Sequence, residues 1–414
     1  MTGRDLRTPT DAAPTRQLRH ARVAVALCFF LNAVLYANLV PRLPEVKADL
    51  GLSNSSLGAA LAALPLGALL AGLASAPLIR RFSSARIATS GLVLLGLAVW
   101  AVAVAPNWPA LAAALLVAGA LDAVVDVAQN AHGLRVQRRY GRSILNGLHG
   151  IWSIGAVSGG LLGSVAAGLA IPLVVHLGVS ALVFGVLALL AFRALLPGDD
   201  DTDRDAGRDA DAATDGEETP AVPQAPGRPS AVLALAALGV LAACGAFVED
   251  AGASWSALYL RTELAAGAAA AGLGFVALQG AMTIGRLTGD RVVDRFGQRR
   301  VVRVGGALTA AGMGWALAFP SVPTTLVGFA MAGLGVATLV PAVYHAADEL
   351  PGLRRGTGLA VINWLLRIGF LLSPPLIGVL ADATSLRVAL LSVVAAGLGA
   401  LLLGRVLPAA AALR

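Results

Sequence analysis

Two aspartates, Asp122 and Asp126, stand four residues apart in a long apolar stretch. On a helix this spacing puts both carboxylates on one face, about 6 Å apart, and Asn130 extends that face by one more turn. Repulsion between close carboxylates and removal from water both favour the protonated form, so such a pair can take up and release a proton. The alternative is that Asp126 caps or pairs near the end of its helix, nine residues before Arg135.

Two further acids, Glu249 and Asp250, are adjacent in another apolar stretch. A charge at the centre of a bilayer costs about 2.5–3.5 kcal/mol, so such residues need a partner, a water-filled cavity or a proton. Adjacent residues of a helix point to different faces, and we therefore expect at most one of these acids to face a cavity. Trp255 favours the alternative of a position in water at an outer mouth, because Trp is common at membrane interfaces.

Cationic groups in apolar stretches likewise need a partner or a water-filled cavity. Arg286 precedes Asp290 by four residues, which favours an ion pair within one helix. Arg367 has no acid within one helical turn, so we expect it to contact another helix or an anionic group of a substrate. His149 lies among small residues and can either relay protons or hydrogen-bond to an acid of the Asp126 helix.

The elements that hold these groups belong to a very apolar chain. Of its 414 residues, 57% are hydrophobic and only 13% are charged. Soluble domains carry about 25% charged residues, so this composition argues against a soluble enzyme, a disordered chain or a nucleic-acid-binding protein. The two cysteines, Cys28 and Cys244, provide neither a disulfide framework nor a metal-ligand spacing. We expect no cofactor and no metal.

Twelve apolar stretches are long enough to cross a bilayer, which takes about 20 residues of helix. They lie at 21–41, 55–79, 87–105, 108–134, 144–169, 171–196, 231–260, 265–289, 301–319, 322–346, 357–381 and 386–408. The predicted fold is an all-α membrane protein with twelve transmembrane helices in two six-helix bundles, at 21–196 and 231–408. The acidic stretch 197–230 is expected to be a disordered cytoplasmic linker. Cytoplasmic tails are expected at 1–20 and 409–414.

Basic residues predict the orientation of these helices. Of 31 Lys and Arg residues, 25 fall in segments on the same side as the N-terminus, four fall on the other side, and two lie within spans. Because basic loops stay inside, this distribution predicts cytoplasmic N- and C-termini in a multi-pass protein of the cell inner membrane. It also accounts for the net charge of +7 without a nucleic-acid partner. The first stretch is expected to be a retained signal anchor.

The second half repeats the first at an offset of 214 residues. Arg81-Phe82 meets Arg295-Phe296, and Ala118-Gly119 meets Ala332-Gly333, with no gap between the two matches. Parallel repeats of six helices place a substrate site at the interface of the halves, near the bilayer midplane.

The same offset pairs His149 with Asn363 and Ser153 with Arg367. We expect these four residues to face a shared cavity. The polar residues expected there with less support are Asn32, Asn38 and Gln279.

At this point the chain resembles the major facilitator superfamily over nearly its full length. The strongest motif is Asp294-Arg295-Phe296-Gly297-Gln298-Arg299-Arg300, which is similar to the second copy of the family's D-R-x-G-R-R/K loop. The resemblance implies a gating role for Asp294, Arg295, Gly297, Arg299 and Arg300. In the first half, Arg80 and Ser83 replace the Asp and the Gly, so we do not carry that role over.

A finer resemblance is to the fucose-permease-like branch of bacterial sugar and metabolite permeases. It is carried by Asp126-Val-Ala-Gln-Asn130, Leu148-His149, Glu249 with Trp255-Ser256, and Ser373-Pro374-Pro375. The resemblance favours Glu249 over Asp250 as the acid that faces the cavity. The sequence departs from the branch at Tyr36-Ala37-Asn38, where the sugar permease has an essential acid.

These observations predict a secondary active transporter, most simply a monomer that contacts protons, a small-molecule substrate and lipid. No nucleotide-binding motif is present, so energy must come from a gradient. The predicted function is proton-coupled symport of a sugar-like or small polar metabolite, with Asp126, Asp122 and Glu249 as the proton-coupling acids. The alternative is proton-antiport efflux of a drug-like or secondary metabolite. A membrane enzyme and a non-transporting sensor have less support, because no catalytic motif is present.

Overall fold

The computed structural model describes residues 15–198, 229–350 and 357–408, and in these ranges it contains helices and no strands. The helices of the N-terminal bundle are α1 (Arg16–Ala37), η2 (Val40–Arg42), α2 (Leu43–Asp49), α3 (Asn54–Leu61), α4 (Ala63–Gly72), α5 (Ser75–Phe82), α6 (Ser84–Ala103), α7 (Trp108–Tyr140), α8 (Leu145–Gly168) and α9 (Leu173–Phe192). Those of the C-terminal bundle are α11 (Pro229–Thr262), α12 (Ala268–Phe296), α13 (Gln298–Ala318), α14 (Val322–Val336), α15 (Leu339–Asp348), α16 (Thr357–Ala383), α17 (Leu386–Ala389), α18 (Leu391–Leu403) and η3 (Gly404–Val406).

Within the described ranges, twelve helical segments are long and apolar enough to cross a membrane. The predicted all-α fold with twelve spans is therefore confirmed. The second span is divided into short helices, and α3 ends at Leu61, four residues before Pro65. Proline has no N–H to donate to the Leu61 carbonyl, which explains a break at this point. The predicted linker lies almost entirely outside the described residues, as do residues 1–14 and 409–414 of the predicted tails. The end of the predicted N-terminal tail, residues 16–20, belongs instead to α1.

The helix boundaries follow the repeat that the sequence predicts. α6 begins at Ser84 and α13 at Gln298, while α7 begins at Trp108 and α14 at Val322. Both pairs are separated by the same 214 residues. Because helix starts depend on local capping rather than on overall hydrophobicity, this agreement shows that the two halves are copies of one six-helix unit.

Both copies use a glycine to bring the same two spans together. A Cβ atom on Gly119 of α7 would overlap the backbone carbonyl of Leu64 in α4, and one on Gly333 of α14 would overlap that of Leu278 in α12. The two contacts are related by the 214-residue offset. Small residues permit this close approach of helix backbones, which is the main way that membrane helices gain packing contacts.

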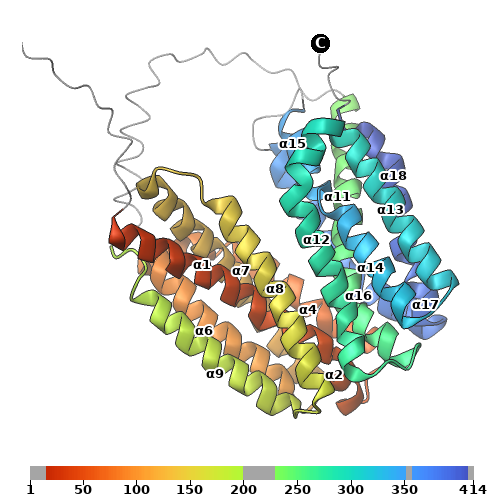
Figure 1. The fold of residues 1–414 in the computed structure, drawn as a ribbon, viewed down its shortest axis with the longest axis horizontal. Helices are drawn as coiled ribbons and strands as arrows, with labels where there is room; N and C mark the ends of the chain where they lie inside the picture. The colour runs from red at the N-terminus through yellow and green to blue at the C-terminus, as the bar shows by residue number, and fades with distance from the viewer. Residues whose placement is uncertain (1–14, 199–228, 351–356, 409–414) are drawn as a thin grey trace, which may run out of the picture.

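The two bundles meet at one end of the molecule and diverge toward the other (Figure 1). α16 packs along α3, and α8 packs along α12. At the closed end, Asp382 of α16 accepts hydrogen bonds from the backbone N–H groups of Asn54 (2.9 Å) and Ser55 (2.8 Å) and from the Ser55 hydroxyl (2.5 Å). We call these three residues the inter-bundle clasp.

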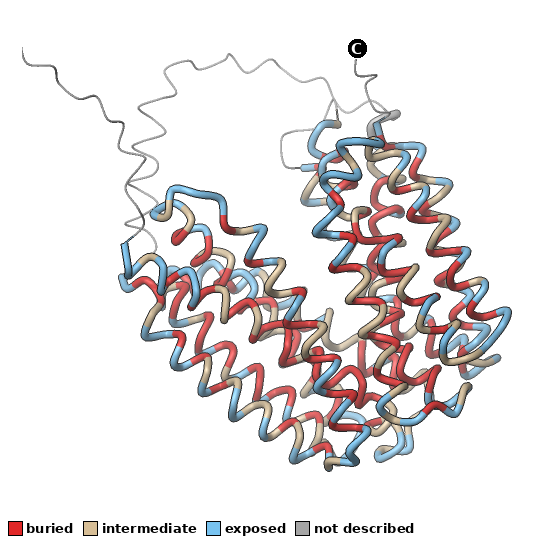
Figure 2. The backbone as a smooth tube through the Cα atoms, viewed as in Figure 1, coloured by how far each residue is buried: buried red, intermediate tan, exposed pale blue. Residues whose placement is uncertain are grey.

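Toward the open end, side chains on the facing sides of the bundles reach solvent. Asp126 of α7, His149 of α8 and Asn363 of α16 are all exposed, whereas buried positions concentrate inside each bundle and where the bundles meet (Figure 2). We call the region where these exposed residues of the two bundles lie the crevice. The structure therefore has one closed end and one open end.

Candidate functional site between the bundles

A cavity of about 290 Å³ lies between the two bundles, and we call it the central cavity. Its polar lining consists of Asn32, Asp122, Glu249, Asp250 and Gln279. Its aromatic lining consists of Tyr36, Trp152, Phe275 and Phe370. Both bundles contribute to both sets. Ligand pockets in proteins measure about 300–1,000 Å³, so the size of this cavity suits a small molecule.

Asp122 is held in place by a chain of hydrogen bonds across three helices. The Asn32 side-chain N–H of α1 donates to Asp122 Oδ1 at 2.8 Å, and the Trp152 indole N–H of α8 donates to Asn32 Oδ1 at 2.9 Å. Because Trp152 can only donate, it fixes which end of the Asn32 amide faces Asp122. The carboxylate thus has a fixed orientation at the wall of the central cavity.

Glu249 and Asp250 both line the central cavity, so the expectation that at most one of them would face a cavity is wrong. Their cavity is wide enough to contact two neighbouring faces of α11. Glu249 forms an ion pair with Arg286 of α12 at 3.2 Å. The predicted pair of Arg286 with Asp290 on the same helix is therefore replaced by a pair between helices.

Asp250 lies beside two serine hydroxyls. The Ser254 hydroxyl donates to Asp250 Oδ1 at 3.4 Å, and Ser373 of α16 is close enough to interact with the carboxyl group. The other oxygen, Oδ2, is buried, and among the described residues no well-formed hydrogen bond reaches it. A buried polar atom without a partner is costly, and at a cavity wall it indicates a group that a ligand or proton satisfies.

Asp126 lies in the crevice rather than in the central cavity. Its carboxylate oxygen Oδ1 accepts hydrogen bonds from the side-chain amides of Asn130 (3.0 Å) and Gln129 (3.3 Å). His149 and Arg367 lie within electrostatic range of it, from α8 and α16. The structure therefore brings together four predicted site residues, Asp126, Asn130, His149 and Arg367, on the two sides of the crevice.

The other predicted cavity residues are more scattered. Asn363 borders the crevice and accepts a hydrogen bond from the Tyr344 hydroxyl at 3.4 Å. Ser153 is buried and donates to the His149 backbone carbonyl at 3.1 Å. Asn38 is fully buried, donates to the Ser180 hydroxyl at 2.9 Å and is absent from the lining of the central cavity. Ser153 and Asn38 thus bond within the N-terminal bundle instead of facing the substrate space, because close packing of α8 and α9 against α1 encloses them.

The predicted gating motif forms the turn between α12 and α13. Gly297 adopts φ +79° there, and the Arg295 guanidinium lies 5.5 Å from the centre of the Phe296 ring. Arg299 donates to the Leu407 backbone carbonyl at 2.6 Å. Asp294 and Arg300 are exposed. The motif lies at the open end, where the two bundles are apart.

The sequence points to four of the five polar residues of the central cavity, Asn32, Asp122, Glu249 and Gln279, but not to the rest of its lining. The resemblance favours Glu249 over its neighbour Asp250, and single aromatic residues in apolar helices look like packing residues. Tyr36 stands where the sequence departs from the sugar-permease pattern. The repeat supplies a usable signal, since the interface between repeats is where a parallel pair of six-helix units places its site.

Comparison with known proteins agrees with this architecture. The Major Facilitator Superfamily is matched over residues 25–249 and 235–412. The chain belongs to this superfamily. An uncharacterized MFS-type transporter of Yersinia pestis is 31% identical over 373 residues, which cover 89% of this chain and 91% of that protein. The membrane protein MosC of Rhizobium meliloti is 30% identical over 375 residues, covering 90% and 87%.

A solved structure shows the same fold. The D-xylose-proton symporter superposes with a TM-score of 0.66 at 16% sequence identity, covering 94% of this chain and 95% of that one. The superfamily match and the apolar spans, rather than this structural likeness, make the chain a multi-pass membrane transporter and not an enzyme. The finer resemblance to the fucose-permease-like branch stays a prediction.

Proposed function

We propose that this transporter moves a small polar solute by alternating access and that protons drive it. The observation that carries the proposal is the central cavity, which lies between the two bundles and takes carboxylates from both, Asp122 from one and Asp250 from the other. A rocking motion of the bundles about this cavity would expose it first to one side of the membrane and then to the other.

The proton-coupling acids are Asp126, Asp122 and Glu249, joined by Asp250. Asp126 is exposed in the crevice and stands one helical turn from Asp122 at the cavity wall. A proton can therefore pass between water in the crevice and the substrate space along one face of α7. The D-xylose-proton symporter shares the fold and is a sugar symporter by name, which supports symport of a sugar-like or small polar metabolite.

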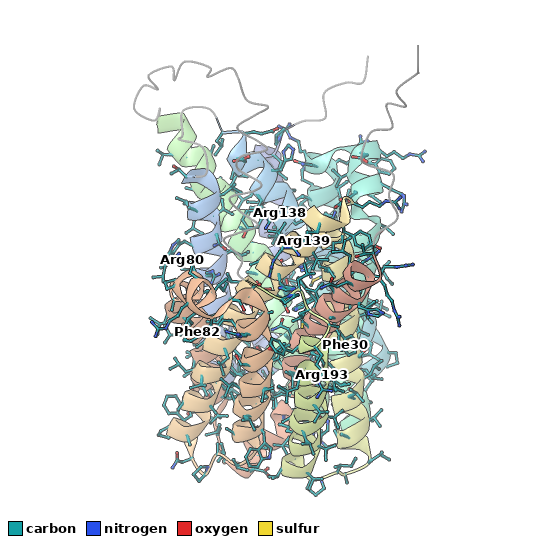
Figure 3. The ribbon with its side chains drawn as sticks, turned by 90° about the vertical axis from the view of Figure 1, so that its left-hand side faces the viewer. Phe30, Arg80, Phe82, Arg138, Arg139 and Arg193 are labelled. Carbon is teal, nitrogen blue, oxygen red and sulfur yellow. The ribbon has the colours of Figure 1, made fainter. Side chains whose placement is uncertain are left out.

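The open end is proposed to face the cytoplasm, in the cell inner membrane. Arg80, Arg138, Arg139 and Arg193 lie toward this end of the N-terminal bundle (Figure 3), and the gating motif with its arginines lies at the same end. Basic residues stay on the cytoplasmic side, so the described conformation would be open to the inside. A single chain contains the whole cavity, which supports a monomer as the working unit.

Replacing Asp126 with Asn tests the coupling. The solute would first be found by a thermal-shift screen of sugars, organic acids and antibiotics on the purified protein. In proteoliposomes, Asp126→Asn should lower uphill uptake at least tenfold and leave solute exchange intact, because Asn keeps the shape but cannot carry the proton. Asp348→Asn, an exposed acid on α15, is the matched control and should transport normally. Unchanged uphill uptake in Asp126→Asn would remove Asp126 from the mechanism.

Proton-antiport efflux is the second candidate. It is favoured by the four aromatic side chains of the central cavity, which suit an apolar ring beside a charged group. The two modes differ in the direction of proton movement. A pH-sensitive dye inside proteoliposomes should report acidification of the lumen when solute enters by symport, and alkalinisation when entering solute exchanges for protons.

A further inference from the structure

The central cavity has an unbalanced charge. In the described part of the chain its lining contains three carboxylates, those of Asp122, Glu249 and Asp250, and no Arg, Lys or His. Arg286 neutralises Glu249 from outside the lining, at 3.2 Å. The positive charges of the crevice, such as Arg367, lie near Asp126 instead. Two carboxylates therefore face the cavity from opposite bundles without a cationic partner in its wall.

The carboxylates of Asp122 and Asp250 lie near the same part of the central cavity. Tyr36 of α1 lies within electrostatic range of both Asp122 and Asp250 and is itself a lining residue. Asp122 receives the Asn32 amide at 2.8 Å, whereas Asp250 receives the Ser254 hydroxyl at 3.4 Å and lies beside the Ser373 hydroxyl of α16. The Ser254 bond is longer than the amide bond to Asp122, and among the described residues no well-formed hydrogen bond reaches the Asp250 oxygen Oδ2.

A second orphan group lines the same cavity. Gln279 of α12 is only 3% exposed, and its side-chain nitrogen Nε2 has no hydrogen-bond acceptor. Buried polar groups are almost always paired, so an unpaired donor and an unpaired acceptor in one cavity indicate a ligand that supplies both partners. The ligand must offer a donor to Asp250 and an acceptor to Gln279.

The aromatic lining adds a further requirement. Tyr36, Trp152, Phe275 and Phe370 are four of only 21 aromatic residues in the chain, yet they gather around this one cavity. Aromatic faces attract cations as well as apolar rings, most strongly at Trp and Tyr. Acids and aromatic faces together favour a positively charged group over a neutral hydroxyl.

We propose that the transported solute is a small organic cation, an ammonium compound that places its charge at Asp250, its ring or carbon body against the four aromatic side chains, and a hydrogen-bond acceptor at the Gln279 amide. The proposal rests on the proposed function in that it takes the central cavity as the substrate site. It narrows the small polar solute to one that carries an amine.

Pairs of molecules that differ only in charge test the proposal. The purified full chain would be titrated with tyramine against 2-(4-hydroxyphenyl)ethanol and with glucosamine against glucose, since both amines carry an N–H donor and a hydroxyl acceptor. Binding would be read as the shift of the thermal unfolding midpoint at constant pH and ionic strength. At least one ammonium compound should bind about tenfold more tightly than its neutral partner, since one charged hydrogen bond in a buried site has roughly that effect.

Three variants locate the binding groups. Asp250→Asn should bring the two members of the responding pair close to equal affinity, and Asp122→Asn should do so only in part. Gln279→Leu should weaken both members alike, because its amide contact does not depend on the ligand's charge. Asp348→Asn, an exposed acid far along the C-terminal bundle, should keep the full preference.

The possible outcomes separate this inference from the proposed function. Equal binding of charged and neutral members in the unmodified protein, or no stabilisation by any cation, overturns the inference. Cations that bind with the expected preference and cross down their own concentration gradient, but that a pH gradient does not drive into proteoliposomes, leave the inference standing and contradict proton-coupled transport. Proton-driven uptake of a neutral solute, with no uptake of the corresponding amine, supports the proposed function and overturns the inference.

Discussion

At the scale of single residues, the best-defined feature is the chain from Trp152 through Asn32 to Asp122. An amide has one donor end and one acceptor end, so a donor on one side and an acceptor on the other leave Asn32 a single orientation. This chain joins α8, α1 and α7 at the wall of the central cavity. The geometry of Asp122 therefore depends on a tryptophan whose hydrogen bond goes to Asn32 rather than to the carboxylate itself.

Removing the Trp152 indole N–H should loosen this arrangement. In Trp152→Phe the Asn32 oxygen loses its donor, and we expect thermal stability to fall by about 1 kcal/mol and transport to fall severalfold. Trp100→Phe is a matched control, because Trp100 also donates through its indole N–H, to the Val174 carbonyl at 3.2 Å, away from the cavity. Purified variants would be compared by thermal unfolding and by solute uptake. Equal effects of the two substitutions would contradict a special role of Trp152.

At the scale of elements, the two copies of the repeat use the same turn with different residues. Ser83 joins α5 to α6 with φ +72° and ψ 151°, and Gly297 joins α12 to α13 with φ +79° and ψ 147°. This region of backbone space is essentially reserved for glycine and costs other residues about 1–3 kcal/mol. The Ser83 side chain makes no capping hydrogen bond to α6 in return. The first-half turn is thus strained where the second-half turn is relaxed.

Ser83→Gly should therefore stabilise the protein. Relief of strain outweighs the greater freedom that glycine gives the unfolded chain, and we expect a net gain of about 1 kcal/mol. The reverse change, Gly297→Ser, should destabilise by a similar amount or more. Thermal unfolding of both variants in the same detergent would measure the pair. A loss of stability in Ser83→Gly would show that the serine makes a compensating contact.

At the scale of the whole molecule, the inter-bundle clasp keeps one end shut while the other is open. Asp382 belongs to the C-terminal bundle. It accepts hydrogen bonds from the backbone N–H groups of Asn54 and Ser55, which belong to the N-terminal bundle. A carboxylate at the start of α3 also interacts favourably with the helix dipole. Opening of this end must break these contacts, so the clasp sets part of the balance between conformations.

Asp382→Asn should shift that balance. The substitution leaves one acceptor for two backbone N–H groups and removes the charge, a loss of about 1 kcal/mol or roughly a fivefold change in population. Spin labels at Asp49→Cys and Thr384→Cys, in a background without Cys28 and Cys244, would report the distance across the closed end. We expect a larger share of long distances in Asp382→Asn and no change in Asp348→Asn. An unaltered distance distribution would show that the clasp does not hold this end.

The apolar pattern and the repeat were enough to predict the twelve spans and the two bundles, because each span must satisfy its backbone hydrogen bonds internally, so its position depends on the local sequence. Spacing along one helix also predicted that Asp122 and Asp126 lie near each other. These properties need only the chain's own periodicity and composition, whereas the family was predicted from the resemblance that the loop motif at Asp294–Arg300 carries.

The tertiary structure alone decided which side chains meet. The sequence predicted an ion pair of Arg286 with Asp290, whereas in the fold Arg286 pairs with Glu249. The sequence favoured Glu249 over Asp250 as a cavity residue, and the cavity includes both. The sequence also predicted Asn38 in the cavity, but packing of α1 against α9 encloses Asn38. Partners on different helices depend on how each helix is rotated and how far it is shifted. Those two quantities come from packing small residues such as Gly119 and Gly333 against neighbouring backbones, which no single helix records.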